Sequence, residues 1–114
     1  MRERYAHDAV LAMDADADAR APGAAITVGL CGHWQHEGPC QLAPHFTAVE
    51  HEGGEVRLRI LFATEPENEA EVRTRIRAAL SAGSLGEARW ELRSDRASEL
   101  RADEADHAAR IAAS

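Results

Sequence analysis

Apolar and polar residues alternate on either side of Gly53-Gly54, and this alternation predicts two strands joined by a two-residue turn. The strands span residues 45–52 and 55–64. Because the turn fixes their register, Glu50 lies opposite Arg57, and we expect a cross-strand ion pair on the polar face. The apolar positions then share the buried face, which consists of Val49, Leu58, Ile60 and Phe62.

A helical period follows the hairpin and predicts the main helix of the domain. Apolar residues recur along one face, at Val72, Ile76, Ala79 and Leu80. On the outer face, glutamate and arginine stand four residues apart in the pairs Glu69–Arg73 and Glu71–Arg75. Thr64 and Glu67 fit a capping box at the start of this helix, and Gly83 fits its end.

Three further segments have the pattern of strands, although less clearly. Residues 24–31 alternate with Ile26, Val28 and Leu30 on one face. Residues 88–93 place Trp90 and Leu92 on one face. Residues 2–13 fit both a strand and a helical face, and we favour the strand.

The other segments complete a single α+β domain over residues 1–114, a length close to the commonest domain size. Residues 14–23 are a polar linker within it, and residues 96–114 form a weakly specified C-terminal helix with few large apolar side chains. We therefore expect a small, mostly antiparallel sheet of four or five strands. The main helix packs on one face of this sheet.

Charge and hydropathy exclude several classes of function. The net charge of −7 argues against binding to nucleic acid and to anionic lipid, because both depend on positive charge. No apolar run reaches the length of a membrane span, and residues 1–10 lack the apolar core of a secretory signal. We expect a cytoplasmic protein whose thiols stay reduced, so metal binding or redox chemistry is favoured over a structural disulfide.

Residues 31–45 hold both cysteines of the chain and three of its six histidines. Thiolate and imidazole are the side chains that bind zinc best in proteins. The segment therefore predicts a zinc site, with candidate ligands Cys31, His33, His36, Cys40 and His45. The best set combines Cys31, Cys40 and His45 with one of the other two histidines. If water replaced one ligand, Glu37 could act as an acid or base, so the chain could be either a binding protein or an enzyme.

Strand alternation raises an objection to this site. If residues 24–31 are a strand, Cys31 points away from its apolar face, whereas His45 points toward the buried face of the hairpin. The two side chains would meet only if the chain bent at Gly29 or Gly32.

Other interpretations of these residues stay open. Cys31 and Cys40 could form a reversible redox pair, or the cysteines and histidines could be inert. The sparse apolar stripe of the C-terminal helix could instead mediate self-association into a homo-oligomer without any cofactor. His7 would join the metal site only if residues 2–13 paired with residues 24–31.

Two pairs of arginines are candidate binding sites for an anion. Arg57 and Arg59 share one strand face, and Arg73 and Arg77 share one helix face. Because glutamates stand beside them, we favour solvated ion pairs over ligand binding at both places.

Overall fold

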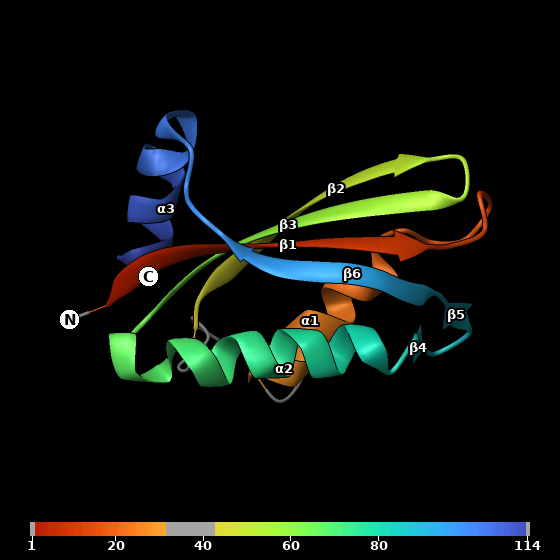
Figure 1. Cartoon of the computed structure of the whole chain (residues 1–114), viewed down its shortest axis with the longest axis horizontal. Coiled ribbons are helices and arrows are strands. Elements are labelled where there is room, and N and C mark those ends of the chain that lie inside the picture. Colours follow the sequence, from red (N-terminus) through yellow and green to blue (C-terminus); the bar gives the residue numbers. More distant parts are fainter. Residues whose placement is uncertain (1, 32–42, 114) are drawn as a thin grey trace.

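The computed structural model describes residues 2–31 and 43–113, apart from the side chain of Cys31. Within these residues a four-stranded antiparallel sheet has the order β2-β3-β1-β6 (Figure 1). Its strands are β1 (Glu3–Ala12), β2 (His45–Glu52), β3 (Glu55–Thr64) and β6 (Glu91–Ser98). The helices α1 (Ala21–Cys31) and α2 (Glu69–Ser81) cover one face, which makes a split β-α-β arrangement. The predicted α+β class is confirmed.

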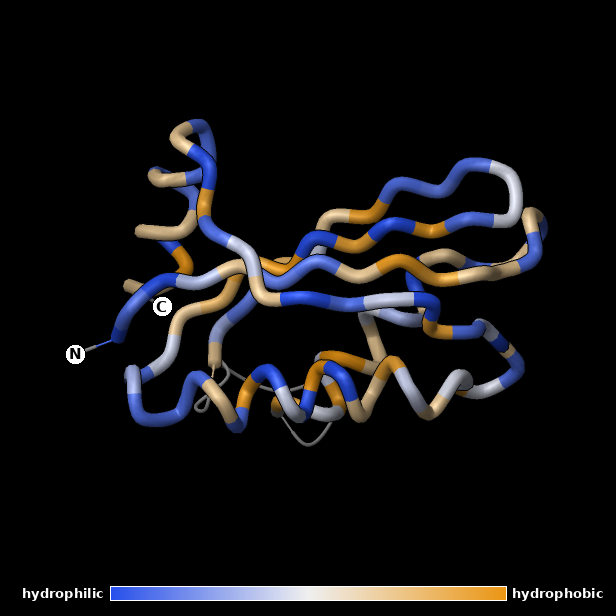
Figure 2. Tube along the Cα trace, in the orientation of Figure 1, coloured by the Kyte–Doolittle hydropathy of each residue, from blue (hydrophilic) through white to orange (hydrophobic). Residues whose placement is uncertain are grey.

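The core lies between the sheet and these two helices. The helix-facing side chains of β3 are buried, and they are Val56, Leu58, Ile60 and Phe62. Figure 2 shows apolar residues along β1 and β3 and on the parts of α1 and α2 that face them. β1 lies between β3 and β6, so the strand interpretation of residues 2–13 is confirmed.

The central hairpin has the predicted register, with Glu50 opposite Arg57 and Val49 opposite Leu58. Two details of the prediction are wrong. Val49 is 37% exposed, because β2 is the edge strand of the sheet. Arg57 donates to Glu55 at 3.0 Å rather than pairing with Glu50, since residues two apart on one strand share a face.

Residues 24–31 are not a strand but most of helix α1, which begins at Ala21 within the predicted linker. Alanine favours a helix, and Pro22 suits its first turn. Ile26 and Leu30, four residues apart, are both buried. A Cβ on Gly29 would lie 3.4 Å from the Cβ of Ala79, so this glycine faces α2 at an ordinary packing distance and bends no strand.

The main helix has the predicted apolar stripe, in which Val72, Ile76 and Leu80 are buried. The predicted ion pairs also form, at 2.8 Å for Glu69–Arg73 and 3.8 Å for Glu71–Arg75. The predicted solvated position of Arg73 is wrong, because its side chain points toward the sheet and is only 15% exposed. The predicted capping box does not form. Thr64 is instead a buried last residue of β3, and a 3-10 turn (Pro66–Asn68) precedes α2.

The C-terminal helix begins later than predicted, because β6 continues to Ser98 and the final strand therefore runs past residue 93. A short hairpin of β4 (Ser84–Leu85) and β5 (Ala88–Arg89) precedes β6, and a 3-10 turn (Ala102–Glu104) precedes α3 (Ala105–Ala112). Ile111 of α3 packs on Ala6 and Leu61, on the sheet face turned away from α1 and α2. This face is called the open face below. Among the described residues, no helix has the length and apolar character needed to cross a membrane.

Gly83 ends α2 with a φ of +72°, and a Cβ there would lie 2.9 Å from the carbonyl oxygen of Trp90. Gly53 also has a positive φ, of +60°, but a Cβ there would meet no atom within 4 Å. We expect Gly53→Ala to lower the free energy of unfolding by about 1–2 kcal/mol, which is the cost of the left-handed backbone alone. Gly83→Ala should cost more, roughly 2 kcal/mol or above, because the clash adds to that cost. Chemical denaturation of both variants tests this, and equal losses would contradict the clash.

Candidate functional site

The structure describes the backbone of two predicted metal ligands, at the two ends of the cysteine- and histidine-rich segment. Cys31 is the last residue of α1, and His45 is the first residue of β2. The other three candidates, His33, His36 and Cys40, lie outside the described residues. Because residue 31 ends a helix, the expectation that strand alternation separates it from His45 is wrong. No bend at Gly29 is involved.

The imidazole of His45 lies against α1. Its Nδ1 donates to the carbonyl oxygen of Ala43 at 3.0 Å, and a carbonyl can only accept, so Nδ1 carries a proton. Its Nε2 lies 2.9 Å from Oγ1 of Thr27, whose hydroxyl is also 3.2 Å from the carbonyl oxygen of Gly23. In the neutral ring, Nε2 therefore directs its lone pair toward α1. Thr27 is one helical turn before Cys31.

Within the described ranges, no group of three or more His, Cys, Asp and Glu side chains is placed to hold a metal ion. His7 lies elsewhere, on β1 and in contact with α2 and β6 rather than with residues 24–31. His107 of α3 packs against Phe46, with ring centroids 4.6 Å apart and the ring planes tilted by 56°.

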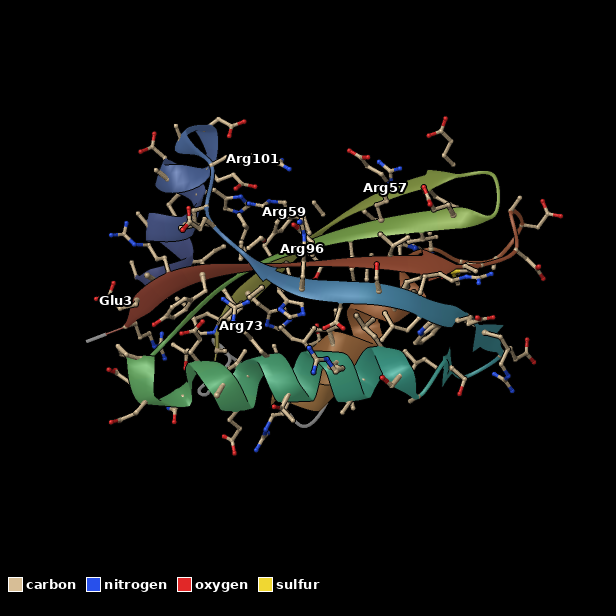
Figure 3. All side chains as sticks on the ribbon, viewed as in Figure 1. Glu3, Arg57, Arg59, Arg73, Arg96 and Arg101 are labelled. Carbon is tan, nitrogen blue, oxygen red and sulfur yellow. The ribbon has the colours of Figure 1, made fainter. Side chains whose placement is uncertain are left out.

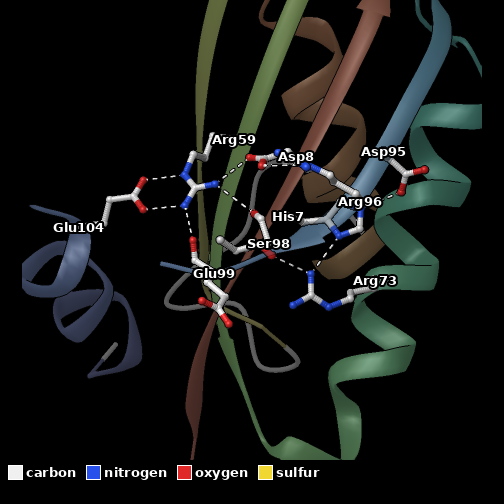
Figure 4. Close-up of polar contacts among 10 residues, drawn as sticks. His7, Asp8, Arg59, Arg73, Asp95, Arg96, Ser98, Glu99 and Glu104 are labelled. Atoms are coloured by element: carbon white, nitrogen blue, oxygen red, sulfur yellow. Dashed lines mark hydrogen bonds and ion pairs between the residues drawn. The ribbon is translucent and has the colours of Figure 1, made fainter. Parts of the chain in front are cut away.

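His7 is the centre of a buried polar cluster that the sequence did not indicate. It is 1% exposed, and its ring is contacted by Arg73, which Figure 3 shows between α2 and the sheet. An N–H of Arg73 donates to Nδ1 of His7 at 3.0 Å, so Nε2 carries the proton and donates to Asp95 at 2.7 Å (Figure 4). Arg77 donates to the same carboxylate at 3.2 Å.

The environment of His7 favours the neutral ring. Burial lowers its pKa, and the nearby Arg73 and Arg77 act in the same direction. The hydrogen bond to Asp95 opposes this effect without overcoming it. The pKa of Asp95 is lowered, although burial raises it, because His7 and Arg77 both stabilise the carboxylate. The cluster thus fixes one tautomer between the sheet and α2.

Arg59 is the centre of a second cluster, on the open face. Its guanidinium donates to two oxygens of Glu104 at 2.7 Å and to Asp8 at 2.8 Å (Figure 4). It also donates to the hydroxyl of Ser98 at 3.1 Å and to the carbonyl of Glu99 at 2.7 Å. Each of the five N–H groups of an arginine thus has an acceptor. The predicted solvated position is wrong here, because the side chain of Arg59 is only 12% exposed.

These contacts change the pKa of both partners in the Arg59–Glu104 pair. The hydrogen bond from Arg59 lowers the pKa of Glu104 from 4.5 to about 2, while the bond to Glu104 raises the pKa of Arg59. Sequence patterns could not identify this pair, because 45 residues separate its members.

The lowered pKa of Glu104 predicts a loss of stability in acid. Its contribution is fully present above pH 4.5, the pKa without Arg59, and is lost as the pH falls toward 2. We expect the free energy of unfolding to fall more steeply over this window in the wild type than in Glu104→Gln. Urea denaturation at a series of pH values measures it. Glu99→Gln is the matched control and should keep the wild-type slope. A Glu104→Gln profile with the wild-type slope would contradict the assignment.

Comparison with known proteins identifies no relative. No family model matches the sequence, and no curated protein or solved structure matches the chain. The side chains of this protein are therefore the basis for inferring its function.

Proposed function

We propose that this protein is a small zinc-binding domain, with the ion held by the segment that joins α1 to β2. The ligands are Cys31, Cys40 and His45 together with one of His33 and His36. Two thiolates neutralise Zn²⁺, and two neutral imidazoles complete a tetrahedral structural site.

The orientation of His45 carries this proposal. A histidine that binds a metal usually donates its other ring N–H to a carbonyl or carboxylate, and Nδ1 of His45 donates to Ala43 in this way. Nε2 then serves as the ligand atom, on the side of the ring that faces α1. Because Oγ1 of Thr27 lies 2.9 Å from Nε2, where the ion would sit, binding of zinc at Nε2 requires the Thr27 side chain to rotate away.

The position of Cys31 favours a metal over a reactive thiol. The C-terminus of a helix carries a partial negative charge, which attracts cations and disfavours an isolated thiolate. Reactive cysteines with a lowered pKa are typically found at helix N-termini or beside cations. Cys31 occupies the opposite end, at the C-terminus of α1. A divalent ion there would stabilise both the thiolate and the helix end.

Metal analysis of the full chain tests the proposal. The protein is purified under reducing conditions, stripped with a chelator and titrated with Zn²⁺ against a chromophoric competitor. We expect one tightly bound ion per chain in the wild type. Cys31→Ser, Cys40→Ser and His45→Ala should each weaken binding by at least about tenfold.

His51→Ala is the matched control, because His51 lies on the same face of β2 near the turn, at the other end of the strand from His45. It should bind Zn²⁺ as the wild type does. A wild-type chain that takes up no Zn²⁺ at micromolar concentration would overturn the proposal, as would a His45→Ala variant with unchanged affinity.

The same preparations distinguish the alternatives. Thiolates held by zinc react slowly until the metal is removed, whereas a redox pair forms a disulfide and loses two hydrogens on mild oxidation. Self-association stays a separate prediction. The apolar stripe of the C-terminal helix suggests self-association. However, Ile111 from this stripe packs on the sheet of the same chain.

A further inference from the structure

The open face of the sheet carries a groove of about 650 Å³. All four strands and the 3-10 turn before α3 contribute to its lining. In Figure 1 the β2–β3 hairpin rises at one end of this face and α3 at the other. Small apolar side chains lie between them, at Val10 and Ala48, so the surface is hollow there. Its volume falls within the range of small-molecule sites, roughly 300–1,000 Å³.

The arginines that line the groove differ in how many of their N–H donors already have an acceptor. Arg59 has all its donors satisfied and is fixed. Arg57 is 66% exposed and contacts Glu55 in a solvated pair, which contributes little to stability. Arg96 is 80% exposed and lies 3.9 Å from Asp8, a carboxylate that Arg59 already engages at 2.8 Å. Arg101 also lines the groove, and Figure 3 shows it extending from the connection into α3.

Three of the four acidic residues of the lining are already engaged by buried or partly buried partners. Asp8 and Glu104 are held by Arg59, and Asp95 is held by His7 and Arg77 on the helix-facing side. Among the described lining residues, Glu50 is then the carboxylate left facing Arg57, Arg96 and Arg101. The formal charges of the lining balance, with four arginines against four carboxylates, but the exposed hydrogen-bond donors of the groove belong to arginines, among them Arg57 and Arg96.

We propose that this groove binds a small organic anion, a carboxylate or a phosphate ester. Guanidinium groups recognise both kinds of oxyanion through paired N–H donors. The anionic group binds at the exposed guanidiniums of the lining, which Arg57, Arg96 and Arg101 contribute from three different segments. The body of the ligand lies on Val10 and Ala48, and Glu50 accepts a hydrogen bond from a ligand hydroxyl or amine. This proposal is independent of the zinc site, because His45 is on the helix-facing side of the sheet.

A titration of the ¹⁵N-labelled full chain followed by amide NMR tests the inference. The probes are benzoate and phenyl phosphate, and benzamide is the neutral control of the same shape as benzoate. We expect saturable shifts at Val10, Ala48 and Ser94 with millimolar or tighter dissociation constants for the two anions. Benzamide should bind much more weakly. Shifts that never saturate, or equal binding of benzamide and benzoate, would overturn the proposal.

Charge-removing variants locate the binding. The double variant Arg57→Gln/Arg96→Gln should weaken binding of both anions by about tenfold, because hydrogen bonds to charged groups are lost. Arg75→Gln is the matched control, since Arg75 lies on α2 on the other side of the sheet. It should bind both probes as the wild type does. If Arg75→Gln and the double variant lose affinity equally, the effect is one of total charge and the groove is not the site. Unchanged affinity in the double variant would likewise contradict the proposal.

Discussion

The guanidinium of Arg59 joins three strands of the sheet to the turn before α3. It is on β3, and its donors bind β1 through Asp8, the end of β6 through Ser98 and the turn before α3 through Glu104. A lysine, with three donors and no planar group, could not reproduce this set of contacts. Removing the side chain would leave the partly buried carboxylate of Glu104 without the cation that binds it, and Asp8 with only Arg96 at 3.9 Å. The position of α3 on the open face, and one end of the groove, therefore depend on this residue.

Different interactions stabilise the two faces of the sheet. The helix-facing side is an apolar core with His7 at its edge, where Arg73 and Asp95 hold the ring in one tautomer. The open face has polar side chains that pair with one another across strands, with Arg59 as the most connected of them. The proposed zinc site belongs to the first side and the proposed anion groove to the second. Each can be altered without touching the other.

The sequence correctly predicted the features that depend on residues close together in the chain. The register of the hairpin at Gly53-Gly54 and the buried stripe of α2 follow from alternation, helical period and turn chemistry. Residues 24–31 were assigned incorrectly because a short apolar run fits both a strand and a helix, and contacts with α2 decide between them. The His7–Asp95 and Arg59–Glu104 pairs could not be found, because 88 and 45 residues separate their members. Of the candidate zinc ligands, only the contacts of His45 add geometry to the sequence prediction.

The strand order has a consequence for how the chain folds. β1 precedes the other strands in the sequence, yet it lies in the middle of the sheet and pairs with β3 on one edge and β6 on the other. During synthesis it has no partner in the sheet until β3 has been made, whereas the β2–β3 hairpin can close locally. Such non-local pairing slows folding, because loop-closure entropy is lost before the contacts form. The sheet is therefore completed only when its last strand leaves the ribosome, and the hairpin is the natural nucleus on which β1 assembles.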